Sequence, residues 1–142
     1  MLRALARVDV AALERNAAML ARAAAPAALC AVVKADGYGH GAVPAARAAQ
    51  AGGARWLAVA TAAEAAQLRG AGIGGPLLVM GALSPEELTV ALRARADVVV
   101  WRQATVTELA RVFTNAFIAY LHICSRGPHW EWTHTRRTAR WM

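Results

Sequence analysis

Short apolar runs alternate with helical patterns along most of this chain, and this alternation restricts the possible folds more than any other feature. The apolar runs centre on Val33, Val59, Val79 and Val99, and a helical pattern follows each of them. Repeated strand–helix units build a parallel sheet, because each right-handed crossover returns the chain beside the preceding strand. The pattern therefore predicts an α/β fold, and it fits a barrel or an open doubly wound sheet equally well.

Capping residues and chain breakers indicate where the helices begin and end. Asp9 is a candidate N-cap, and Pro26 follows the first helical pattern. The segments Thr61–Glu64 and Ser84–Glu87 have the capping-box spacing of a hydroxyl residue followed by a carboxylate three positions later. The expected helices are 10–24, 43–51, two that follow the boxes, and one from Thr105 to Val112; the expected strands are 29–33, 56–59, 77–80 and 97–101.

Lys34 is the only lysine in the chain, and it ends the apolar run 29–33. That continuous run is typical of a fully buried parallel strand. Ligands of parallel βα folds bind at the carboxyl ends of the strands, and burial there helps an amine to lose its proton. A deprotonated amine is what a Schiff-base lysine needs. Position alone also allows a lysine that simply points to solvent.

A glycine-rich turn follows Lys34, with Gly37, Gly39 and Gly41 at alternate positions. We expect these glycines to adopt positive φ in a tight turn. Their spacing is not GxGxxG, so a dinucleotide site is not indicated. His40 has no second metal ligand three or four residues later in the chain, so we expect a structural histidine and no metal.

The segment from Ala31 to Gly41 resembles the cofactor-lysine motif of the alanine racemases, pyridoxal phosphate (PLP) enzymes that interconvert L- and D-alanine. The similarity continues through residues 8–16, 57–69 and 77–81, reaches Trp101 and extends at most to Val112. The resemblance implies the fold of that family, a TIM-like βα barrel joined to a second, β-rich domain. In 142 residues there is room for about half of such a barrel, so the resemblance implies a partial parallel barrel of about four βα units.

The resemblance implies a role for two residues of the motif. Lys34 would form an aldimine with PLP and then serve as one of two acid/base groups, and Tyr38 would lie near the cofactor phosphate. Apart from the resemblance, Tyr38 would be a turn residue that packs over the strand end. Met80 could line the cofactor pocket, but a lone methionine beside an apolar run is more often a core residue. The complete family enzyme is expected to be a homodimer that supplies D-alanine for the cell wall.

The second acid/base of the family is a tyrosine from the partner subunit's second domain, and no residue here matches it. We therefore expect this chain to be truncated and unable to racemise alanine alone. Two alternatives stay open: another barrel-type PLP racemase or decarboxylase, and a non-catalytic PLP-binding protein that keeps Lys34.

The chain changes character after Val112, where alanine becomes rarer and aromatic residues gather. We expect residues 1–112 to be the N-terminal part of the PLP-binding barrel and residues 113–142 to be an unmatched tail, read out of frame. The alternative is a genuine tail. Tyr120 lies in this segment, and the spacing of Cys124, His129, Glu131 and His134 matches no metal motif.

Bulk composition adds expectations about partners and compartment. The net charge of +7 comes mainly from arginines spread along the helical patterns, so no nucleic-acid partner is expected. No apolar stretch is long enough for a membrane helix. Cys30 and Cys124 have no paired spacing, which suits a reducing compartment, and we expect a cytoplasmic protein.

Overall fold

Four parallel strands form one sheet whose order follows the sequence. The structure, a computed structural model, describes residues 6–112. The strands are β1 (Cys30–Val32), β2 (Trp56–Val59), β3 (Leu77–Val79) and β4 (Asp97–Val98), and each pairs in parallel with the next. A doubly wound sheet reverses its strand order part-way, whereas a barrel keeps the order of the sequence. The predicted partial parallel βα barrel is therefore confirmed.

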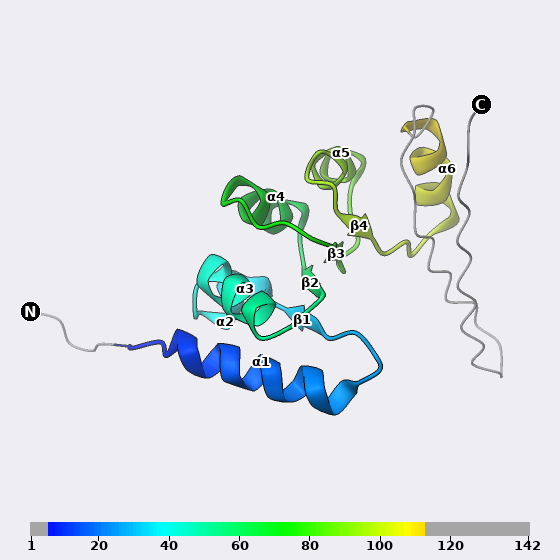
Figure 1. The fold of residues 1–142 in the computed structure, drawn as a ribbon. Coiled ribbons are helices and arrows are strands. Elements are labelled where there is room, and N and C mark those ends of the chain that lie inside the picture. The colour runs from blue at the N-terminus through cyan, green and yellow to red at the C-terminus, as the bar shows by residue number, and fades with distance from the viewer. Residues whose placement is uncertain (1–5, 113–142) are drawn as a thin grey trace, which may run out of the picture.

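Helices cover one side of these strands (Figure 1). Within residues 6–112, the helices are α1 (Val10–Ala24), α2 (Lys34–Tyr38), α3 (Ala42–Ala51), α4 (Ala62–Gly70), α5 (Pro85–Arg93) and α6 (Gln103–Val112). α3, α4 and α5 lie along the same side of the sheet, and α1 packs against α3. None of these described helices is long and apolar enough to span a membrane.

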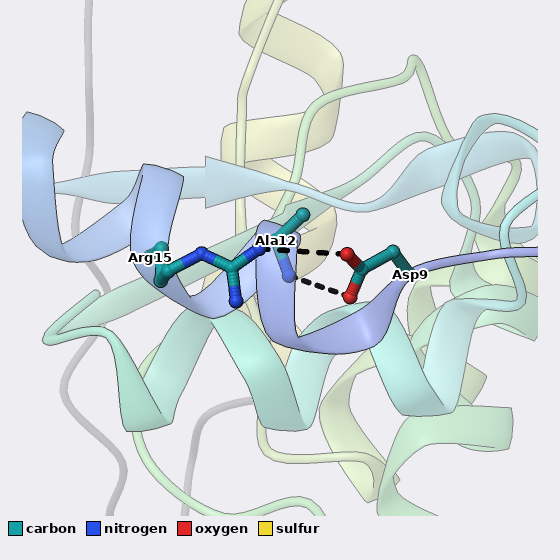
Figure 2. Close-up of polar contacts among 3 residues, drawn as sticks. All are labelled: Asp9, Ala12 and Arg15. Carbon is teal, nitrogen blue, oxygen red and sulfur yellow. Dashed lines mark hydrogen bonds and ion pairs between the residues drawn. The ribbon is translucent and has the colours of Figure 1, made fainter.

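Local capping explains why the helices begin where they do. The Oδ1 atom of Asp9 accepts a hydrogen bond from the Ala12 amide at 2.9 Å, and Oδ2 lies 3.4 Å from the Arg15 guanidinium (Figure 2). Both predicted capping boxes are present, at Thr61 with Glu64 and at Ser84 with Glu87. These side chains satisfy amide groups of the first helical turn that have no partner within the helix.

The core lies between the sheet and its covering helices. Its largest fully buried side chains are Leu57, Val59, Leu68, Leu77 and Val79. Alanines fill most of the remaining core positions and allow helices to approach closely. The prediction of a fully buried first strand is wrong, because β1 has only one neighbouring strand among the described residues, and its Val32 is 38% exposed.

Arg69 binds the loops at the edge of the sheet where the strands begin. Its guanidinium donates hydrogen bonds to the carbonyls of Ile73 and Ala94, each at 2.7 Å, and of Gly75 at 2.8 Å. These carbonyls belong to the loops that lead into β3 and β4. This edge is therefore held by a charge-assisted network, and the opposite edge carries the strand ends, with Lys34 directly after the end of β1.

Several boundaries differ from the prediction. β4 ends at Val98 instead of Trp101, because its partner β3 ends at Val79. The one further hydrogen bond between the two segments runs from the Val99 amide to the Val79 carbonyl. α6 begins at Gln103 instead of Thr105, and the Thr105 amide already donates to the Arg102 carbonyl at 3.1 Å. β1 and β3 are also shorter than the runs that predicted them.

The contact between α1 and α3 gives a prediction about Gly52. A Cβ atom at this position would lie 2.5 Å from the Glu14 carbonyl oxygen and 2.6 Å from Cβ of Ala17. We expect Gly52→Ala to destabilise the fold by about 1–3 kcal/mol, because the helices must separate. Urea denaturation followed by circular dichroism measures this change.

Gly70→Ala is the matched control, since nothing lies within 4 Å of a Cβ atom there. It should be neutral or slightly stabilising. Equal destabilisation by both variants would contradict the close approach of α1 and α3.

Candidate active site

Lys34 lies at the carboxyl edge of the sheet. Val32 pairs with Ala58, and the Val33 amide donates to the Ala58 carbonyl at 2.8 Å, so the chain leaves β1 level with the end of β2. At the end of β3, the Gly81 amide donates to the Ala60 carbonyl at 3.1 Å, and a Cβ atom on Gly81 would collide with that oxygen. The ends of β1, β2 and β3 thus lie side by side at the edge of the sheet that carries Lys34.

The backbone turns left-handed directly after Lys34. φ is 51° at Ala35, 52° at Asp36, 63° at Gly37, 55° at Tyr38 and 82° at Gly39. We call residues 35–39 the left-handed turn; α2 is therefore not a right-handed helix beyond its first residue. Positive φ was predicted for the glycines, but not for the other three residues. For non-glycine residues this conformation costs about 1–2 kcal/mol each.

Hydrogen bonds inside the glycine-rich segment hold the left-handed turn. The Gly39 amide donates to the Ala35 carbonyl at 3.1 Å, and the Asp36 carboxylate accepts from the Ala42 amide at 2.8 Å, at the start of α3. His40 Nδ1 lies 2.9 Å from the Gly37 carbonyl oxygen. This contact agrees with the structural role predicted for His40.

The Glu64 carboxylate joins the left-handed turn to the neighbouring strand. Its Oε1 accepts from the Ala35 amide at 2.6 Å, and its Oε2 accepts from the amides of Ala60 at 2.8 Å and Thr61 at 3.0 Å. Burial alone would raise the pKa of Glu64, but the hydrogen bonds from Ala35, Thr61 and Ala60 outweigh it, so the pKa lies below its ordinary value. The carboxylate is therefore ionised near neutral pH.

The side chain of Lys34 is half-buried, so the described residues do not enclose it as fully as predicted. Among residues 6–109, no carboxylate forms an ion pair with its amine. Tyr38 is 58% exposed, four residues along the turn, and Met80 is half-buried at the end of β3. A primary amine without a competing carboxylate can attack a carbonyl group when it is unprotonated.

Other candidate residues were missed by the sequence analysis or lie elsewhere. It identified Glu64 only as a helix cap and gave Asp36 no role of its own. The two boxes looked alike, and only the position of the Thr61 box after β2 could have drawn attention to Glu64. The described part of the chain has no cluster of His, Cys, Asp or Glu that could hold a metal ion. Tyr120, Cys124, His129, Glu131 and His134 lie outside the described residues.

The left-handed turn predicts an unusual gain in stability from glycine. Ala35→Gly should stabilise the fold by about 1 kcal/mol, because glycine adopts φ near 51° without the penalty of a Cβ atom. Ala66→Gly, at an exposed position inside α4, should destabilise by about the same amount. Urea denaturation of both variants tests the opposite signs, and loss of stability in both would contradict the left-handed turn.

The lowered pKa of Glu64 predicts how its contribution to stability varies with pH. The ionised carboxylate stabilises the fold fully above its ordinary value of 4.5, and this contribution is lost as the pH falls through the lower pKa of the folded state. The difference in unfolding free energy between the wild type and Glu64→Gln should therefore shrink on acidification. A difference that grows as the pH falls would contradict the assigned hydrogen bonds.

Comparison with known families agrees with this geometry. The family model described as "Alanine racemase, N-terminal domain" matches residues 8–123. This match continues past residue 112, where the sequence analysis placed the end of the resemblance. The division of the chain at residue 112 itself stays a prediction.

Relatives of known name match the same part of the chain. Alanine racemase from Thermobifida fusca is 51% identical over 104 residues, which cover 73% of this chain and 28% of the relative. The enzyme from Streptomyces coelicolor is 48% identical over 121 residues, which cover 78% of this chain and 30% of the relative. The chain thus spans about three tenths of the length of these relatives.

Solved structures show the same fold. Alanine racemase from Streptomyces coelicolor A3(2) superposes with a TM-score of 0.73 at 38% identity, over 85% of this chain and 36% of that one. The enzyme from the D-cycloserine-producing Streptomyces lavendulae gives 0.72 at 39% identity, over 80% and 30%. The order of the strands, the motif around Lys34 and these matches together lead to one conclusion: the chain belongs to the alanine racemase N-terminal domain family.

Proposed function

We propose that this chain is the cofactor-binding part of an alanine racemase, with PLP held covalently by Nζ of Lys34. The observation that carries the proposal is the position of the chain's single lysine, at the carboxyl edge of the partial barrel and directly before the left-handed turn. Ligands bind at this edge in parallel βα folds. We also propose that the Tyr38 phenol contacts the cofactor phosphate.

The chemistry of the described residues fits the attachment of PLP. The cofactor aldehyde requires a primary amine, and Lys34 supplies one that is half-buried and has no ion pair within residues 6–109. The exposed phenol of Tyr38 offers a hydrogen-bond donor four residues further along. Lys34 and Tyr38 are the residues of the described range that we assign to the cofactor.

Lys34 would also carry one of the proton transfers. When bound, PLP withdraws electrons from Cα of an attached amino acid and so acidifies the Cα proton. The Lys34 amine, once released from the cofactor, can accept or return this proton on one face of the substrate. Racemisation needs a second group on the opposite face. Tyr38 is the only tyrosine in the described range and is assigned to the phosphate, so we place that group elsewhere.

This arrangement predicts PLP binding without racemisation by the chain alone. The complete enzyme would be a cytoplasmic homodimer acting on alanine, in which the partner subunit completes the site. A non-catalytic PLP-binding protein is the second candidate, because Tyr38, the one tyrosine of residues 6–112, is assigned to the phosphate and not to proton transfer. Another barrel-type PLP racemase or decarboxylase would share the attachment to Lys34 and differ in the residues that select the substrate.

Covalent trapping tests the assignment of Lys34. Borohydride reduction of the chain with PLP should fix the cofactor on Lys34, and peptide mass spectrometry should locate it there. Lys34→Arg should abolish trapping at residue 34, because a guanidinium does not form the linkage.

A relocated lysine provides the matched control. Lys34→Arg combined with Arg22→Lys restores one lysine at an exposed position in α1. This variant should not recover stable trapping, since Arg22 lies in the last turn of α1, a helix that packs mainly against α3. Equal trapping on the relocated lysine would show a nonspecific amine reaction and contradict the proposed site.

A further inference from the structure

One carboxylate in this structure has a contact that its helix does not require. Glu64 and Glu87 occupy the same place in two capping boxes, each three residues after the hydroxyl residue that begins the box. Among the described residues, the Glu87 carboxylate accepts only from the Ser84 amide, at 2.9 Å. Glu64 makes the equivalent contact with Thr61 and also accepts from Ala60 and Ala35. The chain thus contains a capping glutamate with the additional contacts and one without them.

The contact with Ala35 fixes the first residue of the left-handed turn. Ala35 begins the turn with positive φ, and Glu64 Oε1 accepts from its amide at 2.6 Å. Hydrogen bonds to an ionised carboxylate are shorter and stronger than those between neutral groups. Ala35 follows Lys34 directly, so this bond restrains the backbone from which the lysine side chain extends.

The other carboxylate oxygen anchors this restraint to the sheet. Oε2 accepts from the Ala60 and Thr61 amides, where β2 leads into α4. β2 is the strand that pairs with β1, and its Val59 side chain is fully buried. Glu64 therefore ties the left-handed turn to a rigid part of the fold 29 residues away in sequence.

We propose that Glu64 is a positioning residue that holds the Lys34 amine in place through the Ala35 backbone. This inference rests on the proposed attachment of PLP to Lys34 and extends it to a residue outside the lysine motif. Glu64 itself touches neither substrate nor cofactor in this account. One oxygen of its carboxylate accepts a hydrogen bond from the Ala35 amide, and the other accepts from the Ala60 and Thr61 amides. A glutamine side chain has one oxygen and one NH2 group, so it cannot accept on both sides.

Glu64→Gln and Glu87→Gln are a matched pair of variants. Glutamine also supports a capping box, so both variants keep an acceptor for their own helix. In Glu64→Gln, the side-chain NH2 group then faces the Ala35 amide, and two donors oppose each other. Urea denaturation establishes that each variant is folded. If Glu64→Gln does not fold, Glu64→Asp, which keeps the charge and shortens the reach, replaces it.

The first readout is the affinity for PLP, measured by titration and borohydride trapping in the 142-residue chain. We expect roughly tenfold weaker binding in Glu64→Gln, the loss typical of one broken charged hydrogen bond, and no change in Glu87→Gln. Equal affinity in both variants and the wild type would overturn the positioning role and leave the proposed function intact.

The second readout needs no cofactor. Reductive methylation with ¹³C-formaldehyde labels Lys34 as the only lysine, and its dimethylamine NMR signal reports the surroundings of the amine. The signal should move toward the position of the urea-unfolded chain in Glu64→Gln and stay at its wild-type position in Glu87→Gln. An unchanged signal in both variants would overturn the proposal.

The two readouts separate this inference from the proposed function. A wild-type chain that traps no PLP on Lys34, with a displaced signal in Glu64→Gln, would refute PLP attachment and support positioning by Glu64. Trapping on Lys34 that is equally strong in all three proteins would support PLP attachment and refute positioning.

Discussion

Because Ala35, Asp36 and Tyr38 all have positive φ, the backbone after Lys34 adopts a conformation that non-glycine residues rarely sustain. Other contacts must therefore hold it. Asp36 accepts from the first amide of α3, the Glu64 carboxylate accepts from Ala35, and Gly37 lies close to α3, with Ala45 3.1 Å from where its Cβ would be. Strained backbone of this kind is concentrated at functional sites, where the surrounding structure fixes it.

The two edges of the sheet are stabilised in different ways. Arg69 binds carbonyl groups of the loops before β3 and β4, with no contribution from the segment around Lys34. At the carboxyl edge, Gly81 allows β3 to approach Ala60 closely, and Glu64 fixes the turn beside it. Hydrogen bonds thus hold both edges, and the carboxyl edge also presents the Lys34 amine.

Periodicity and capping chemistry predicted much of the fold. The strand 56–59, the Asp9 cap and both capping boxes follow from local residue choice, and the structure contains them. The sequential strand order needed the family resemblance, because right-handed crossovers permit two kinds of sheet. The burial of β1 was overestimated, since an apolar run does not show whether a neighbouring strand will cover it.

The site was less accessible to sequence reasoning. The position of Lys34 at a strand end could be predicted from the end of an apolar run, and the glycines indicated a tight turn. The left-handed conformation of Ala35 could not be predicted, because the local preference of alanine is for right-handed helical backbone. The contact between Glu64 and Ala35 depends on that conformation and on the register of β1 with β2, so it emerges only in three dimensions.

The most direct test is a crystal structure of the 142-residue chain grown with PLP. The account predicts continuous electron density between Nζ of Lys34 and the cofactor, with Ala35 in its left-handed conformation. Density for PLP at another residue, with a free Lys34 amine, would contradict it.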